Sequence, residues 1–167
     1  MKIIKKKICM LGGFCVGKTS LVQRFVRSIF SDTYQTTVGV RIDQKTVKLE
    51  DTQVDLILWD IHGDDEFQKV QAMYLRGMAG YLLVTDGTRR STLEQVERLQ
   101  ALSVSVVGDV PFILLINKAD LVSDWEITTE DIERLKTNGW RVLKTSAKND
   151  HGVNEAFEEL TKLMLSA

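Results

Sequence analysis

Short, continuous apolar runs recur along the chain. Three of them, residues 8–11, 81–85 and 112–116, contain no charged side chain. Runs of this length, without alternation of apolar and polar positions, are typical of β-strands that are buried on both faces. Residues 54–60 and the shorter segment 140–143 are also predicted to be strands, because apolar residues dominate them. Strands are therefore expected from one end of the chain to the other.

Between the runs, apolar residues recur every three or four positions, as on one face of an α-helix. The clearest case is residues 153–164, which a helix is predicted to cover. The same period predicts helices over residues 64–74, from residues 91–94, where Ser-Thr-x-Glu resembles a capping sequence, and from the threonine pair at 128–129. A first helix is predicted directly after the glycine-rich segment 12–19.

The alternation of strands and helices predicts an α/β fold built on a mostly parallel sheet. Residues 38–49 have a strand-like composition, and only the polar turn 50–53 separates them from the strand at 54–60. A turn this short predicts an antiparallel hairpin. With 167 residues the chain is long enough to bury one full core, so one domain over residues 1–167 is expected.

Composition and charge narrow the function classes. The chain is 44% hydrophobic and 27% charged, with a net charge of −1, which gives no reason to expect nucleic-acid binding. The cluster Lys5-Lys6-Lys7 is interpreted as a solvated strand entrance rather than a membrane-binding patch. The two cysteines, Cys9 and Cys15, are too few for a disulfide framework and indicate a reducing, cytoplasmic compartment.

No membrane segment or lipid anchor is expected from the sequence. No apolar stretch approaches the roughly 20 residues of a membrane span, and no signal peptide is recognisable. Because no cysteine follows Cys15, C-terminal prenylation is not expected, and Met1-Lys2 does not permit myristoylation.

Residues 12–19, here called the phosphate loop, fit the pattern G-x-x-x-x-G-K-S/T. The loop lies between a predicted strand and a predicted helix, which is the context that the pattern requires. Glycines let main-chain amides curl around an anion, and a helix N-terminus adds further N–H groups. Lys18 is predicted to contact the β- and γ-phosphates of a nucleotide, and the Thr19 hydroxyl to bind Mg²⁺. The alternative is an ordinary glycine-rich turn.

Polar residues follow the apolar run 112–116, at the end where a parallel sheet binds its ligands. The Asp120 carboxylate can accept two hydrogen bonds from guanine, at N1–H and at the exocyclic amine, whereas adenine offers neither pattern. Asn117 and Lys118 stand beside it, and the Lys118 stem could lie along the base. Alone, residues 117–120 could be a polar turn; together with the phosphate loop they indicate guanine selection.

Five motifs in a fixed order make the chain resemble a small GTPase of the Ras superfamily. The motifs are residues 12–19, Thr37, Trp59-Asp60-x-x-Gly63, residues 117–120 and residues 146–148. The resemblance covers nearly the whole chain, and residues 37–40 and 74–77 look nearest to the Rab-like branch. It implies a P-loop NTPase fold with a six-stranded, mostly parallel sheet, one antiparallel edge hairpin and about five flanking helices.

The resemblance also implies which residues bind the nucleotide and the metal. Because Thr37 and Gly63 would sense the γ-phosphate, it implies a switch with two states. The implied Mg²⁺ ligands are Thr19, Thr37 and Asp60. The implied catalytic residues are Lys18, Thr37, Gly63 and Asp64. The implied contacts to GTP or GDP are made by Gly12, Phe14, Cys15, Val16, Gly17, Lys18, Thr19, Ser20, Phe30, Thr37, Gly63, Asn117, Lys118, Asp120, Leu121, Ser146, Ala147 and Lys148.

Two positions depart from the family pattern and predict slow hydrolysis. Phe14 occupies a position that is usually small, and Asp64 replaces the usual glutamine, which orients the attacking water. The γ-phosphate would repel the Asp64 carboxylate, and Phe14 would fill the space that an arginine from an activating protein needs. Alternatively, Asp64 or Asp65 orients the water in its own geometry. His62 is interpreted as an orienting or surface residue.

The sequence therefore predicts a guanine-nucleotide switch that binds GTP or GDP with Mg²⁺ and hydrolyses GTP slowly. Protein effectors and regulators are expected to bind residues 30–42 and 62–78 of a monomer. A GTP-binding scaffold without turnover is one alternative. An ATP-dependent phosphotransferase is another, which Asn117 and Asp120 oppose.

Overall fold

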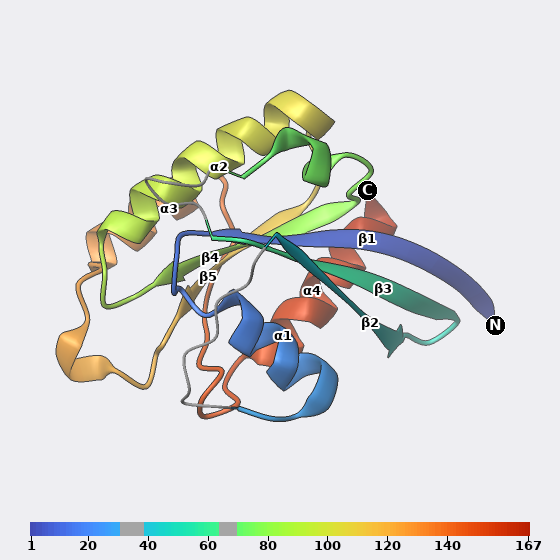
Figure 1. Ribbon diagram of the computed structural model, residues 1–167, viewed down its shortest axis with the longest axis horizontal. Coiled ribbons are helices and arrows are strands. Elements are labelled where there is room, and N and C mark those ends of the chain that lie inside the picture. The colour runs from blue at the N-terminus through green and yellow to red at the C-terminus, as the bar shows by residue number, and fades with distance from the viewer. Residues whose placement is uncertain (31–38, 64–69) are drawn as a thin grey trace.

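Six strands form one mixed sheet in the computed structural model, which describes residues 1–30, 39–63 and 70–167 (Figure 1). The strand order is β2-β3-β1-β4-β5-β6, with β2 antiparallel to β3 and the other neighbours parallel. The strands are β1 (Lys2–Gly12), β2 (Val40–Lys48), β3 (Thr52–Ile61), β4 (Gly80–Asp86), β5 (Phe112–Asn117) and β6 (Val142–Lys144). The mostly parallel sheet with one antiparallel edge hairpin is thus confirmed.

Helices cover both faces of this sheet. The described residues contain α1 (Lys18–Arg27), α2 (Ser91–Val107), α3 (Thr129–Thr137), α4 (Val153–Ser166) and two short 3₁₀ turns, η1 (Ala72–Leu75) and η2 (Val122–Asp124). In Figure 1, α1 and α4 lie on one face, and α2 and α3 lie on the other. This three-layer arrangement buries every residue of β4, which explains why its apolar run is continuous.

Alternate side chains of each strand enter opposite cores. Leu82 and Val84 of β4 belong to the core that α1 and α4 cover, whereas Leu83 belongs to the core on the α2 side. The rings of Phe25 on α1 and Phe157 on α4 stack with their centroids 4.0 Å apart. This contact joins α1 to α4 on the same face of the sheet, and the phosphate loop leads directly into α1.

β1 begins before the apolar run at residues 8–11 that predicted it. Residues 2–6 pair in parallel with residues 52–56 of β3. Such pairing uses backbone groups, so it does not need apolar side chains. The Nζ of Lys7 lies 3.6 Å from the centroid of the Trp59 ring, a cation–π contact. The lysine cluster therefore forms part of the strand itself.

Two helix predictions are confirmed. In α4 all the predicted core residues are buried, at Val153, Ala156, Phe157, Leu160 and Met164. Thr128 is the N-cap of α3, where it forms a capping box with Asp131. No helix among the described residues is long and apolar enough to cross a membrane.

Two other helix predictions agree with the structure in part. α2 begins at Ser91, as predicted, but no side chain caps it, because the N-cap residue is Arg90, whose guanidinium has no hydrogen-bond acceptor. Of the helix predicted over residues 64–74, residues 64–69 lie outside the described residues. In the described remainder, the 3₁₀ turn η1 begins at Ala72, and Gln71 before it has an extended backbone. The described residues contain four α-helices, against about five predicted for the whole chain.

The strand order places a crevice at the carboxyl end of β1. After β1 the chain forms β3 on one side, and it then crosses to form β4 on the other side. Ligands of open α/β sheets bind at such a reversal, outside the carboxyl ends of the strands. The phosphate loop leaves β1 at this point, and Asp60, Asp86 and Asn117 stand at or beside the ends of β3, β4 and β5.

Gly12, the last residue of β1, packs so tightly against β4 that no side chain fits at this position. A Cβ added to Gly12 would overlap with the carbonyl oxygen of Val84, a backbone atom that cannot easily move aside. We expect Gly12→Ala to lower the free energy of unfolding by about 1–3 kcal/mol, measured by chemical denaturation. The control is Gly13→Ala, whose Cβ would meet the end of the flexible Gln95 side chain. Equal stability of the two variants would contradict this explanation.

Candidate functional site

The phosphate loop enters α1 through two residues with positive φ. Cys15 has a φ of 61° and Gly17 a φ of 102°. A Cβ on Gly17 would overlap with the Nδ2 atom of Asn117, so glycine is required at this position. The first backbone bond of α1 runs from the N–H of Leu21 to the Gly17 carbonyl oxygen, at 2.9 Å. The turn therefore brings the N-terminus of α1 to the crevice, where its first N–H groups can bind an anion.

Lys18 is buried against the loop, with 6% of the residue exposed. Its Nζ donates to the carbonyl oxygen of Gly13 at 3.0 Å and to that of Gly12 at 3.4 Å. A buried ammonium needs such acceptors, because the loss of water around a charge is costly. The positive charge is therefore held inside the loop, where it can attract a phosphate.

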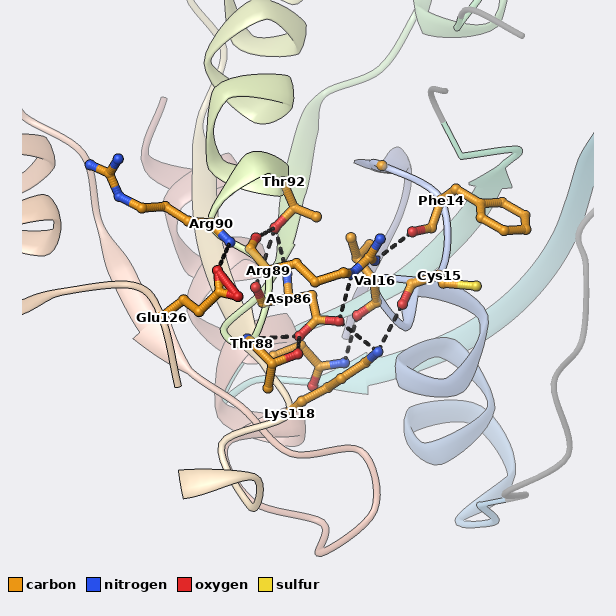
Figure 2. Close-up of polar contacts among 12 residues, drawn as sticks. Phe14, Cys15, Val16, Asp86, Thr88, Arg89, Arg90, Thr92, Lys118 and Glu126 are labelled. Carbon is orange, nitrogen blue, oxygen red and sulfur yellow. Dashed lines mark hydrogen bonds and ion pairs between the residues drawn. The ribbon is translucent and has the colours of Figure 1, made fainter. Parts of the chain in front are cut away.

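Three successive carbonyl groups of the loop are each held by a side chain from the end of a neighbouring strand or the loop after it (Figure 2). In a trans peptide, a carbonyl group and the N–H that follows it point in opposite directions. The N–H groups of Cys15, Val16 and Gly17 are therefore turned towards the inner side of the loop, where an anion can bind. The bonds join Arg89 Nη2 to Phe14 at 2.6 Å, Lys118 Nζ to Cys15 at 2.9 Å and Asn117 Nδ2 to Val16 at 3.0 Å.

Asp86, the last residue of β4, orients two of these donors. Its Oδ2 accepts from Lys118 Nζ at 2.7 Å and from Arg89 Nε at 3.0 Å, as Figure 2 shows. Its Oδ1 accepts from the backbone N–H and the hydroxyl of Thr88, at 2.9 and 2.7 Å. Burial acts to raise the pKa of Asp86, but the hydrogen bonds from Lys118 and Thr88 outweigh it, so the pKa lies below its usual value. Asp86 is therefore charged at neutral pH.

Asp86, Arg89 and Arg24 belong to this site although no motif identifies them. The position of Asp86 offered a signal, because it follows a buried run whose carboxyl end lies at the ligand-binding edge. Arg24 on α1 donates to the carbonyl oxygens of Ala147 and Lys148, at 2.8 and 2.9 Å. Neither arginine lies in a segment whose pattern points to a ligand.

Thr19 and Asp60 face one another beside the loop. The Thr19 hydroxyl donates to Asp60 Oδ2 at 2.5 Å, and Asp60 is fully buried. Hydroxyl and carboxylate oxygens suit Mg²⁺, which usually takes its remaining ligands from water and substrate phosphates. Across the described ranges, no three His, Cys, Asp or Glu side chains form a metal site by themselves. The pair therefore fits a Mg²⁺ ion that is shared with a phosphate.

Asp120 and the segment around Ser146 form the other end of the site. The Ser146 hydroxyl donates to Asp120 Oδ1 at 2.7 Å, which fixes the carboxylate. The Ser146 carbonyl oxygen accepts from the N–H of His151 at 3.0 Å, so the N–H of Ala147 points to the opposite side. A carboxylate acceptor and a backbone donor placed together can pair with the N–H groups and the carbonyl of a guanine base.

Asn117 joins the two ends of the site. It is the last residue of β5 and is 2% exposed. Its Nδ2 donates to the Val16 carbonyl, and its Oδ1 accepts from the Thr145 hydroxyl at 3.1 Å. Because both ends of the Asn117 amide bond to the protein, Asn117 positions the phosphate loop, and Asp120 is the residue that can offer its side chain to a base.

Gly63 and Phe14 meet at the outer end of the loop. A Cβ on Gly63 would lie 2.8 Å from the carbonyl oxygen of Gly13 and 2.8 Å from the Cα of Phe14. Phe14 is 38% exposed, and its ring points away from Arg89 in Figure 2. Gly63, which directly precedes the predicted hydrolysis residue Asp64, thus packs against the loop.

The remaining predicted residues lie either outside the described part of the chain or around the loop. Thr37, Asp64 and Asp65 lie outside the described residues. The backbone N–H of His62 donates to the Gly39 carbonyl at 2.8 Å. Further contacts were predicted at Phe30, which packs partly against the core under α1 and α4, at Ser20 in the first turn of α1, at the exposed Leu121 and at Lys148.

Comparison with known proteins identifies the family of this chain. The sequence profile of the Ras family matches residues 7–166. The chain is 32% identical over 161 residues to Ras-related protein Rab-13 of Mesocricetus auratus, a match that covers 95% of this chain and 79% of that protein. It is 35% identical over 170 residues to Ras-related protein Rab-32C of Dictyostelium discoideum, with 98% and 75% covered. The chain therefore belongs to the Ras family and is a Rab-like small GTPase, an enzyme that hydrolyses GTP.

Proposed function

We propose that this GTPase is a guanine-nucleotide switch that uses Mg²⁺ and hydrolyses GTP slowly. The observation that carries the proposal is the double role of residues 117–120. Asn117 and Lys118 hold carbonyl groups of the phosphate loop, while Asp120 presents a carboxylate that Ser146 fixes. One short segment therefore sets the distance between a phosphate site and a base site, as a nucleoside di- or triphosphate requires.

Selection of guanine is proposed to depend on Asp120 and Ala147. The Asp120 carboxylate would accept from N1–H and from the exocyclic amine of guanine, and the Ala147 N–H would donate to the guanine carbonyl. Adenine would place an acceptor against the Asp120 carboxylate, leaving buried polar groups without partners. A site of this kind rejects the wrong base by the cost of those unmade bonds.

The state of the switch is proposed to depend on the γ-phosphate. Thr19 and Asp60 would hold Mg²⁺ in both nucleotide states, and Thr37 would bind it only when the γ-phosphate is present. The bound ion would neutralise charge on the phosphates. The N–H of Gly63, which packs against the outer end of the loop, would sense the same phosphate.

Partners are proposed to bind residues 30–42 and 62–78 of a monomeric, cytoplasmic chain. Ile42 on β2 is 55% exposed and pairs with Trp59, and Met73 is 61% exposed. Exposed apolar side chains in segments that respond to the γ-phosphate suit the binding of protein effectors and regulators. A reducing compartment is supported by Cys9 and Cys15, both free thiols.

The proposal is tested by displacing a fluorescent GDP analogue from the full chain with GDP, GTP, ADP and ATP in the presence of Mg²⁺. We expect guanine nucleotides to compete on the order of 10³-fold better than adenine nucleotides. Chelation of Mg²⁺ should then speed release of the analogue. Equal competition by ADP and GDP would overturn the proposal and favour an ATP-dependent enzyme.

A further inference from the structure

Arg89 is a charged contact of the phosphate loop that lies outside all five sequence motifs. It belongs to the connection between β4 and α2 (Figure 2), and its Nη2 donates to the Phe14 carbonyl oxygen at 2.6 Å. Its Nε donates at 3.0 Å to Asp86, whose side chain is 2% exposed. Its own carbonyl oxygen accepts from the Thr92 hydroxyl at 2.7 Å. Both the backbone and the guanidinium of Arg89 are therefore fixed.

Such an arginine acts differently from a mobile surface charge. The N–H donors of a guanidinium lie in one rigid plane, so binding Nε to a buried carboxylate also fixes the direction of Nη2. In this case Nη2 is directed at the Phe14 carbonyl. Of the three loop peptides whose carbonyls are held by side chains from neighbouring strand ends, Arg89 thereby links β4 to the one between Phe14 and Cys15, which neither Lys118 nor Asn117 contacts.

The Phe14–Cys15 peptide needs an external partner. Cys15 has a φ of 61°, a conformation that residues other than glycine rarely adopt. Rotation of this peptide would turn the Cys15 N–H away from the inner side of the loop. Bonding of the Phe14 carbonyl to Arg89 opposes that rotation, because the carbonyl and the N–H of one peptide move together.

The Cys15 N–H lies towards the end of the loop that is farther from the base site. Val16 and Gly17 adjoin Asn117, which is linked to the base end. Phe14 instead adjoins Gly63, which is proposed to sense the γ-phosphate. The phosphates that the Cys15 N–H can reach are therefore those beyond the α-phosphate.

We propose that Arg89 is a positioning residue for the distal phosphates, which holds the Phe14–Cys15 peptide so that the Cys15 N–H faces them. The inference rests on the proposed guanine-nucleotide function. It requires no contact between Arg89 and the nucleotide. It implies that loss of Arg89 weakens binding of GDP, which has a β-phosphate, and spares binding of GMP, which has none.

The test compares the affinities of GDP and GMP for the full chain in Mg²⁺, by displacement of a fluorescent GDP analogue. We expect Arg89→Ala to weaken GDP binding about tenfold, the effect of one hydrogen bond, and GMP binding by less than about twofold. Arg89→Gln should recover part of the loss, because its amide can still donate. The matched control is Arg90→Ala, which removes the adjacent arginine, whose Nη2 pairs with Asp131 at 2.6 Å. It should leave both affinities unchanged.

A second measurement follows the Cys15 amide directly by ¹⁵N NMR. In the unmodified protein its resonance should shift when GDP binds, and in Arg89→Ala the shift should shrink. Equal losses of GDP and GMP affinity, or unchanged GDP affinity and Cys15 shift, would overturn this inference alone. If the unmodified protein bound neither GDP nor GTP, the proposed function would fail, and the inference with it.

Discussion

Replacing Asp120 with asparagine should lower the affinity for GDP by at least about a hundredfold, since two hydrogen bonds to a charged acceptor are lost. The new amide N–H₂ would face the donors of guanine, so neither group would be paired. Xanthine carries an oxygen at C2, which the amide can donate to, so preference should move towards xanthine nucleotides. The fold should be retained, because the asparagine oxygen can still accept from the Ser146 hydroxyl.

The measurement is competition between GDP and XDP for the variant and for the unmodified protein. Asp124→Asn is the matched control, because Asp124 is an exposed aspartate of the neighbouring turn η2 and should not affect base choice. Unchanged GDP affinity in Asp120→Asn, or equal losses for GDP and XDP, would contradict the assignment of Asp120 to the base.

The second large effect is expected in hydrolysis, where Asp64→Gln should raise the intrinsic rate roughly tenfold or more. A carboxylate near the γ-phosphate is opposed by a repulsion of about 1–4 kcal/mol at about 4 Å, and each 1.4 kcal/mol or so removed from the barrier gives about tenfold in rate. Glutamine is neutral and can both donate to and accept from a water. Asp65→Asn is the control, because it removes a neighbouring charge without supplying a group at the hydrolysis position.

Phe14 is expected to act by a separate cause. Its Cα lies against Gly63 and its side chain is partly exposed, so the ring stands at the outer end of the loop. Phe14→Gly should do little alone, because it opens space without adding chemistry. With an activating protein that supplies an arginine, it should make accessible a gain of about 10³–10⁵ in rate.

Single-turnover hydrolysis of GTP separates these two causes, using both single variants and the double variant. The hydrolysis rate should rise in Asp64→Gln without an activating protein, and in Phe14→Gly mainly when an activating protein is present. A brisk rate in the unmodified protein that falls in Asp64→Gln would contradict this explanation. It would make Asp64 the residue that orients the water.

Elements with a strong local signal could be predicted from the sequence. The runs at 81–85 and 112–116 contain no charged residue because the sheet is covered on both faces, and α4 repeats its apolar residues with the helical period. The lysine-rich start of β1 could not be predicted in this way. Its residues join the sheet through backbone pairing with β3, which leaves no mark on the apolar pattern.

The residues of the candidate site also fall into two groups, those that the sequence predicts and those that only the fold reveals. The phosphate loop and Asp120 have fixed spacings that the chemistry of a nucleotide imposes, so a motif identifies them. Arg89 contacts a residue 75 positions away in the chain, and Arg24 contacts one 123 positions away. Such contacts exist only once the fold brings distant loops together. The structural role of Asn117 likewise became visible only with its partners, Val16 and Thr145.

The central claim, that this chain is a slow guanine-nucleotide switch, is tested most directly by following one bound nucleotide over time. The full chain is loaded with GTP labelled on the γ-phosphate in the presence of Mg²⁺, and bound GTP, bound GDP and released phosphate are measured. We expect GTP to remain bound and to convert slowly to bound GDP, with phosphate released in step and no conversion of ATP. Bound GTP that never yields GDP, or equal turnover of ATP, would contradict the claim.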